Sequence, residues 1–268
     1  MVKVKLGHQP RGKFIVLEGI DGCGKTTQAK LLESKLITAG IIPVHRTFEC
    51  SDGPIGSMIR HDFLSGDVKV DSTVLNDLFI VDREDHLKNP RDGGLAEIID
   101  SGTHIICDRY VLSSMAYTLQ DLSDACDKNL IPVTEYRAAV QAVYEKNVSN
   151  LHILSPDLTI FIDVDVKTAV DRINAGRDNK SIYDNEERLN KIYRAYQSVL
   201  NFFDQDIRLT GYHALQKAIP HIGPGRFTEY SAIAVSDHII NQNIVLVDGC
   251  ESEEEVSKNI FNLVKDLF

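Results

Sequence analysis

The chain lacks the positive charge, the paired cysteines and the long apolar runs that are typical of several protein classes. Its 268 residues carry 29 Lys and Arg against 39 Asp and Glu, a formal net charge of −10. A net negative charge works against binding of a nucleic-acid backbone, for which clustered positive charge is expected. No apolar stretch approaches the length of a membrane span, and residues 1–13 lack the apolar core of a signal peptide.

The cysteines are also not arranged in a way that would give them a structural role. The five cysteines are odd in number, widely spaced and without a C-x-x-C pair, so neither a disulfide scaffold nor a zinc site is expected. We therefore predict that the protein works in the reducing cytoplasm. The length fits one large α/β domain better than two small ones.

The most informative segment that is present runs from 14 to 30, with the sequence FIVLEGIDGCGKTTQAK. Its apolar start predicts a strand, its end predicts a helix, and the residues between them match the phosphate-binding pattern GxxxxGK[ST]. Backbone N–H groups of such a loop, together with the positive end of the helix, attract phosphate. A glycine-rich turn with no ligand is the alternative, which the complete motif disfavours. The residues predicted to bind a nucleoside triphosphate here are Gly19, Asp21, Gly22, Cys23, Gly24, Lys25, Thr26 and Thr27, with Lys25 on the β- and γ-phosphates and Thr26 on Mg²⁺.

Strand-like runs alternate with helical patterns along most of the chain. The predicted strands are 14–17, 41–48, 104–107, 158–164 and 244–247, and the main predicted helices are 25–39, 74–87, 95–100 and 166–173, with a last helix after Ser252. This alternation predicts a three-layer α/β/α fold with a parallel sheet and a ligand site at the carboxyl ends of its strands. Residues 119–155 are largely helical and are expected to pack as an excursion from the main α/β body, outside its regular alternation of strands and helices. Residues 204–242 contain Gly-Pro-Gly and are expected to form an inserted loop or a small subdomain.

A second polar segment, Asp108-Arg109-Tyr110, follows the predicted strand 104–107 directly. It is therefore expected at the same sheet edge as the phosphate loop. A carboxylate there can hold Mg²⁺ or its waters, and an arginine can clamp a second phosphate. For this segment taken alone, a surface Asp–Arg pair that caps the strand is an equally good interpretation.

Four segments, in this order, resemble the thymidylate kinase family of nucleoside-monophosphate kinases. They are LEGIDGCGKTTQ at 17–28, LFIVDREDH at 78–86, ICDRYVLSSMAY at 106–117 and PDLTIFIDV at 156–164. The resemblance covers residues 14–117, 156–200 and 244–268. It implies a P-loop NTPase fold in one kinase domain over 1–268, with a lid at about 172–186. It also implies ATP as donor, Mg²⁺ as cofactor, dTMP as acceptor and a homodimer packed through helices.

The same resemblance implies roles for individual acceptor-site residues. Asp21 is expected to accept a hydrogen bond from the 3′-hydroxyl of the acceptor. Phe79 is expected to stack on the thymine ring, and Arg83, one helical turn on, to donate to a base carbonyl. Without the resemblance, Phe79 would be interpreted as a core aromatic. The other implied contacts are Ser114 at the far edge of the base, Tyr117 beside the sugar 2′ position, Arg109 and Arg60 on the acceptor phosphate, and Asp108 with Thr26 on the metal.

The chain also departs from the family pattern. Relatives take a catalytic arginine from the phosphate loop or from the lid, and Gly22 occupies the loop position here. The lid run 172–180 offers Arg177 as the predicted catalytic arginine and Arg172 as the second candidate, both near the ATP phosphates. A solvated helix end, whose cations complement the helix dipole, is the alternative. The predicted catalytic set is Lys25, Asp21, Arg109 and Arg177.

A second departure concerns the acceptor. Where many relatives have Thr-Arg-Glu-Pro-Gly-Gly, this chain has Thr-Phe-Glu-Cys-Ser-Asp at 47–52, which places Phe48 at the expected base pocket. The identity of the acceptor therefore stays open. Another deoxynucleoside monophosphate, such as dUMP or dGMP, or a deoxynucleoside is the alternative to dTMP. A nucleotide-binding module without turnover is the alternative from a different class.

Overall fold

The protein folds around one parallel β-sheet. The structure is a computed structural model that describes residues 11–66, 68–89, 94–151, 154–176, 185–203, 208–209 and 243–268. The strands of the described part are β1 (Phe14–Glu18), β2 (Val44–Phe48), β3 (His104–Asp108), β4 (Leu158–Asp163), β5 (Arg208–Leu209) and β6 (Ile244–Asp248). They pair in the order β2-β3-β1-β4-β6-β5, and every pair is parallel. The predicted parallel sheet is confirmed.

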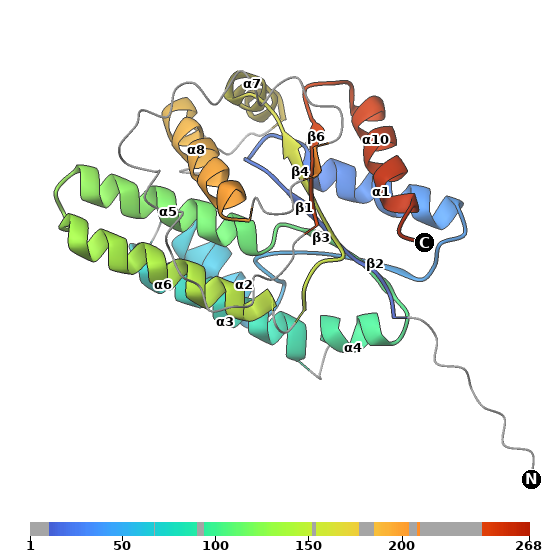
Figure 1. The fold of residues 1–268 in the computed structure, drawn as a ribbon, viewed down its shortest axis with the longest axis horizontal. Helices are drawn as coiled ribbons and strands as arrows, with labels where there is room; N and C mark the ends of the chain where they lie inside the picture. The colour runs from blue at the N-terminus through green and yellow to red at the C-terminus, as the bar shows by residue number, and fades with distance from the viewer. Residues whose placement is uncertain are drawn as a thin grey trace, which may run out of the picture.

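Helices lie on both sides of this sheet, so the predicted three-layer architecture is confirmed. In Figure 1, α1 and α10 lie on one side, and α5 and α8 lie on the other with α6 and α3 beyond α5. The helices of the described part are α1 (Lys25–Thr38), α2 (Pro54–Met58), α3 (Ser72–Lys88), α4 (Leu95–Asp100), α5 (Val111–Asp127), α6 (Val133–Leu151), α7 (Val166–Gly176), α8 (Glu186–Phe202) and α10 (Glu253–Lys265), with a π-helical turn η1 (Ile59–Phe63) after α2.

The position of each strand in the sheet follows from its sequence. β1 is central, and all five of its residues are buried, as expected for a parallel strand with helices on both faces. β2 lies at the edge and begins only at Val44, because Pro43 has no N–H to donate to a ladder. The strand predicted over 41–48 is therefore present but shorter at its start.

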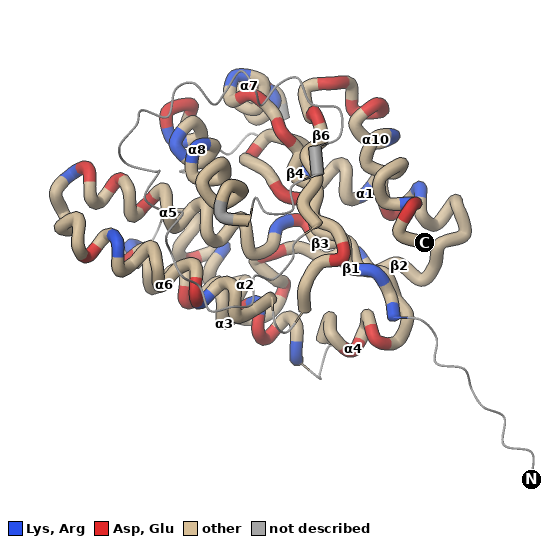
Figure 2. Tube along the Cα trace, viewed as in Figure 1, with Lys and Arg blue, Asp and Glu red and all other residues tan. Residues whose placement is uncertain are grey.

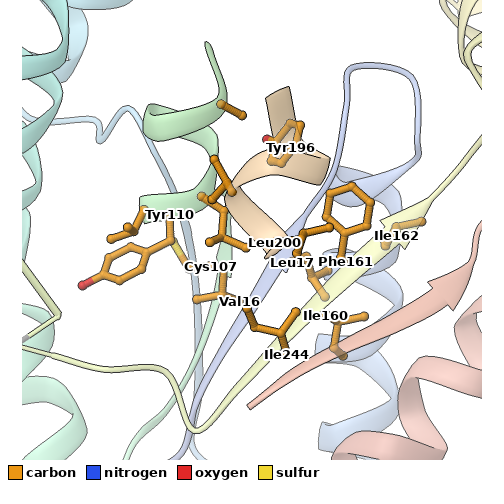
Figure 3. Packing of buried hydrophobic residues seen from close by; sticks show 14 of the residues in the cluster. Val16, Leu17, Cys107, Tyr110, Ile160, Phe161, Ile162, Tyr196, Leu200 and Ile244 are labelled. Atoms are coloured by element: carbon orange, nitrogen blue, oxygen red, sulfur yellow. The ribbon is translucent and has the colours of Figure 1, made fainter. Parts of the chain in front are cut away.

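The core is formed where the sheet meets α5 and α8. Figure 3 shows Val16 and Leu17 of β1 near Phe161 of β4, with Tyr196 and Leu200 of α8 over them. All five are buried. Removal of such apolar surface from water contributes roughly 25 cal/mol per Å², so this packing holds α8 firmly on the sheet.

The region predicted as a helical excursion belongs to this same core. Residues 119–155 contain the second half of α5 and all of α6, and Val140, Val143 and Val148 of α6 are buried in the main apolar cluster. The helical prediction for this region agrees with the structure, and the helices pack against the body rather than away from it. Most of 204–242, and the larger part of the predicted lid, lie outside the described residues.

The surface of the described part carries charges of both signs. Figure 2 shows acidic and basic positions interspersed along the outer helices α6 and α8, whereas the charged positions of α5 are acidic. No helix within the described ranges is long and apolar enough to cross a membrane.

Candidate active site

The carboxyl edge of the sheet brings the predicted site segments together. In the β1–β3 register Leu17 lies beside Asp108, and in the β2–β3 register Phe48 also lies beside Asp108. The phosphate loop, the Asp108–Arg109 turn and Phe48 therefore start from the same edge, because parallel strands end together. The expectation that the phosphate loop and the Asp108–Arg109 turn share one sheet edge agrees with the structure.

The phosphate loop has the backbone that its glycines allow. Gly19, Gly22 and Gly24 have φ values of 143°, 81° and 98°, which residues with a Cβ rarely adopt. A Cβ on Gly22 would also lie 2.4 Å from the carbonyl oxygen of Ala169. Helix α1 begins at Lys25 immediately after this turn, so its free N–H groups point toward the loop.

Lys25 is buried within the loop. It is 5% exposed, and its Nζ donates to the carbonyl oxygens of Gly19 at 2.9 Å and Ile20 at 2.7 Å. An ammonium group held by neutral carbonyls can exchange these contacts for charged phosphate oxygens, which bind more strongly. The lysine is thus poised for the predicted role.

A cavity of about 640 Å³ lies over this loop. Its walls are the loop residues Asp21 to Gln28, the turn Asp108–Arg109, the residues Arg172 and Ile173 of α7, and the segment 249–256 after β6. Arg172 donates from Nη2 to the Gly249 carbonyl at 2.9 Å, which ties α7 to the far wall. We refer to this space as the donor cavity. Arg172 is therefore placed at the predicted site, whereas Arg177 lies outside the described residues.

Thr26 and Asp108 form the predicted metal pair. The Thr26 hydroxyl donates to Oδ2 of Asp108 at 2.5 Å, and Oδ1 of Asp108 is buried with no hydrogen-bond partner. A hydroxyl and a carboxylate beside a phosphate loop are hard oxygen ligands of the kind that Mg²⁺ prefers. The two residues therefore fit a Mg²⁺ ion and would supply it with oxygen ligands.

Arg109 and Asp21 form an ion pair at the centre of the site. Nη2 of Arg109 donates to Oδ1 of Asp21, and both side chains are about one-fifth exposed. Arg109 has φ 74°, a left-handed conformation that costs non-glycine residues about 1 kcal/mol or more. Its N–H is held by the Leu17 carbonyl at 2.9 Å, which fixes this conformation. The guanidinium reaches the phosphate loop, where its Nη1 donates to the Gly19 carbonyl at 3.3 Å.

A second cavity of about 400 Å³ lies on the other side of this ion pair. Asp21 and Arg109 line both cavities, so they form a shared wall. The second cavity, which we call the acceptor cavity, is mainly apolar, and Phe48, Phe79 and Tyr117 contribute aromatic rings to it. Its other predicted residues are Arg60 and Ser114.

Tyr117 connects the acceptor cavity to the central ion pair. Its hydroxyl donates to Oδ2 of Asp21 at 2.8 Å, and the Arg109 guanidinium lies 5.4 Å from its ring centroid. Asp21 thus accepts hydrogen bonds from both Arg109 and Tyr117. Arg60, at the opposite wall, donates to the carbonyls of Cys50 and Ser51.

Arg83 is placed behind the acceptor cavity rather than on its surface. It is 1% exposed and does not contribute to the lining of the cavity. Its Nη2 donates to Ser114 at 2.6 Å, and its Nε donates to Oε2 of Glu49 at 2.8 Å within an ion pair. Its Nη1 donates to Asn147 and Asn150. Burial raises the pKa of the Glu49 carboxyl to about 7, an effect that the Arg83 guanidinium opposes. The contact of Arg83 with a base remains a prediction, while Ser114 does reach the cavity wall.

Three polar residues of the site were not singled out from the sequence. Glu49 had no assigned role, although a carboxylate within a strand-end motif is a signal. Glu18 is fully buried inside the apolar strand β1, where an acidic residue is unexpected and could have been noticed. Tyr196 on α8 has no motif around it, and only the tertiary structure brings it to Arg109.

The fold and the paired cavities define a P-loop protein with two nucleotide-sized pockets on either side of one Arg–Asp pair. The sequence model of the family described as thymidylate kinase matches residues 17–211. A probable thymidylate kinase of Methanococcus maripaludis (strain C7) is 36% identical over 190 residues, which cover 70% of this chain and 78% of that protein. A thymidylate kinase of Leptospira borgpetersenii is 31% identical over 198 residues, covering 74% and 85%.

The chain belongs to the thymidylate kinase family. Its resemblance to that family is thereby confirmed. Among solved structures, a thymidylate kinase from Candida albicans superposes with a TM-score of 0.60 at 18% identity, and the match covers 96% of this chain and 92% of that one. At this identity the superposition supports the fold.

Proposed function

We propose that this protein transfers the γ-phosphoryl group of ATP onto dTMP, giving dTDP and ADP, as a step in dTTP synthesis. The observation that carries the proposal is the Asp21–Arg109 pair, which separates a phosphate-loop cavity from an aromatic cavity. An acceptor phosphate in the second cavity would face a γ-phosphate in the first. Direct transfer between two bound nucleotides needs such placement and no covalent enzyme intermediate.

On the donor side, the loop N–H groups and Lys25 would bind the triphosphate. Thr26 and Asp108 would hold Mg²⁺, whose chemical contribution is to neutralise charge on the phosphate oxygens. Arg172 is positioned at the wall of this cavity by Gly249. Arg177 is proposed as the cation that stabilises the transferring phosphoryl group.

On the acceptor side, Arg109 would bind the phosphate and Asp21 would accept the hydrogen bond of the sugar 3′-hydroxyl. Phe79 and Phe48 offer rings for stacking on the base. Tyr117 is proposed to crowd the sugar 2′ position. Ser114 is proposed to contact the edge of the base, since its hydroxyl accepts from Arg83 and so keeps its own proton for a carbonyl.

A cytoplasmic homodimer is part of the same proposal. The five cysteines are odd in number and widely spaced in the sequence, which supports a reducing compartment. Val74 and Val81, two turns apart on α3, are 50% and 48% exposed and would be covered by a partner helix. Size-exclusion chromatography with light scattering tests this point, and a mass of one chain at micromolar concentration would refute the homodimer.

An ADP-release assay over a panel of nucleosides and nucleoside monophosphates tests the proposed reaction. We expect turnover with dTMP to exceed that with dUMP, dGMP and thymidine. Turnover with another acceptor but none with dTMP would overturn the acceptor assignment. The absence of turnover with every acceptor would favour a nucleotide-binding module instead.

A further inference from the structure

Tyr196 of α8 lies under the centre of the proposed active site. Its side chain is 0% exposed, and its ring packs against Phe161 at 5.3 Å between centroids (Figure 3). Its ring also meets that of Tyr117 edge-on at 6.3 Å. A buried phenol needs a hydrogen-bond partner for its hydroxyl, so the contacts of this hydroxyl show what the residue does.

The Tyr196 hydroxyl connects Glu18, the last residue of β1, to Arg109, the first residue after β3. It lies 2.7 Å from Oγ of Ser113, 3.2 Å from Oε2 of Glu18 and 3.4 Å from Nη1 of Arg109. Glu18 is a fully buried carboxylate at the end of β1, and it also accepts from the Ser113 hydroxyl at 2.6 Å. The N–H groups of Tyr110 and Ser113 complete its hydrogen bonds.

These contacts hold one nitrogen of the Arg109 guanidinium. Nη1 donates to Ser113 at 3.1 Å, to the Gly19 carbonyl at 3.3 Å and to Tyr196. The other nitrogen, Nη2, is directed to Asp21. Half of the guanidinium is thus anchored in the core, and half faces the wall that the two cavities share.

We propose that Tyr196 is a positioning residue, whose hydroxyl connects the buried Glu18 carboxylate to Nη1 of Arg109 and fixes that guanidinium between the two phosphate sites. The inference rests on the proposed phosphoryl transfer. It makes α8 a structural part of the active site, although that helix carries no phosphate-binding motif. If the guanidinium moved by about 1 Å, the rate of phosphoryl transfer would fall roughly 100-fold, the scale expected for misplaced catalytic groups.

Tyr196→Phe tests this inference, because it removes the hydroxyl and keeps the ring that packs in the core. We expect kcat to fall at least about tenfold, while KM for ATP changes less than about twofold. Tyr193→Phe is the matched control. Tyr193 lies one turn earlier on α8, and its hydroxyl donates to Asp163 at 2.9 Å, away from Arg109. The control should keep kcat within about twofold of the parent protein, and a similar Tm in both variants would exclude a general loss of stability.

A double-mutant cycle separates positioning from a general effect. In an Arg109→Lys background, Tyr196→Phe should have little further effect, because the group that it positions is already gone. Additive effects of the two changes would overturn the inference. So would a kcat of Tyr196→Phe within twofold of the parent.

A second measurement does not depend on turnover, and so distinguishes failure of this inference from failure of the proposed function. The side-chain ¹⁵N–¹H NMR signal of Arg109 should shift and broaden in Tyr196→Phe but not in Tyr193→Phe. An unchanged Arg109 signal would refute the positioning role even if the protein phosphorylates dTMP. A changed signal in a protein without turnover would support it while the proposed reaction fails.

Discussion

The donor cavity and the acceptor cavity share Asp21 and Arg109 but are built in different ways. The largest single contribution to the donor cavity is one continuous segment, the loop and first turn of α1, and its chemistry uses backbone N–H groups with Lys25. The acceptor cavity draws side chains from β2, η1, α3 and α5, which are far apart in the chain. Phosphate recognition is thus encoded locally, whereas base recognition depends on how four elements pack.

The two halves of the site, the donor half around the donor cavity and the acceptor half around the acceptor cavity, also differ in what maintains their shape. Glycine conformations fix the phosphate loop, and few side chains are needed. Behind the acceptor cavity, a buried network centred on Arg83 and Glu49 connects α3 to the segment just after β2, to α5 and to α6. A buried ion pair is costly to break. Single substitutions around the acceptor cavity should therefore mainly lower the stability of the protein, whereas those around the donor cavity should mainly lower its rate.

The largest effect is expected in the donor half. Lys25→Ala should lower kcat at least about 1,000-fold, because it removes the cation that neutralises the transferring phosphate. Lys30→Ala, an exposed lysine on the same helix, is the control and should leave kcat unchanged. ADP release under saturating substrates measures both. Substantial turnover in Lys25→Ala would remove the basis for assigning this loop a catalytic role.

In the acceptor half, the corresponding change acts on stability. Arg83→Met leaves the buried Glu49 carboxylate without its partner, and the free energy of unfolding should fall by about 3–5 kcal/mol. Lys146→Met breaks an exposed pair with Asp77, whose side chains are both 49% exposed, and should cost at most about 1 kcal/mol. Urea unfolding compares the two. Equal losses would contradict the view that the Arg83 network maintains this half.

A smaller effect is expected for Thr26 and Asp108, the two residues proposed to hold Mg²⁺. Asp108→Asn removes the negative charge that would attract Mg²⁺, so the Mg²⁺ concentration for half-maximal activity should rise about 10- to 100-fold. Addition of EDTA should abolish activity in the parent protein. A Mg²⁺ titration of the ADP-release rate measures this shift. An unchanged midpoint in Asp108→Asn would exclude Asp108 from metal binding.

The smallest effect concerns sugar selection in the acceptor half. Tyr117→Ala opens space beside Asp21 and should raise the activity with ribonucleotides relative to deoxyribonucleotides by several-fold, although total activity falls. Tyr117→Phe keeps the ring and loses only the hydroxyl, so it should leave this ratio nearly unchanged. Ratios of kcat/KM for matched acceptors decide the question. If Tyr117→Ala has the parent ratio, the ring does not restrict the 2′ position.

The sequence predicted the described part of the fold well, because its strands and helices carry strong local patterns. The strands before the phosphate loop and before Asp108 were expected within one residue of their observed ends. Residues 119–155 were harder to interpret, since helical periodicity alone does not say whether a helix packs on the core. The buried face of α6 answers that question through contacts with distant elements.

What the sequence by itself determined is the chemistry of the donor side: a loop of glycines, Lys25 and Thr26, whose spacing specifies phosphate binding without reference to the rest of the chain. Only the tertiary structure decided that Arg83 supports the acceptor cavity from behind and that Tyr196 reaches Arg109. The physical reason is the range of the interactions. Backbone conformation in a turn depends on neighbouring residues, but the partner of a buried charge is chosen by packing between elements that can be far apart in the sequence.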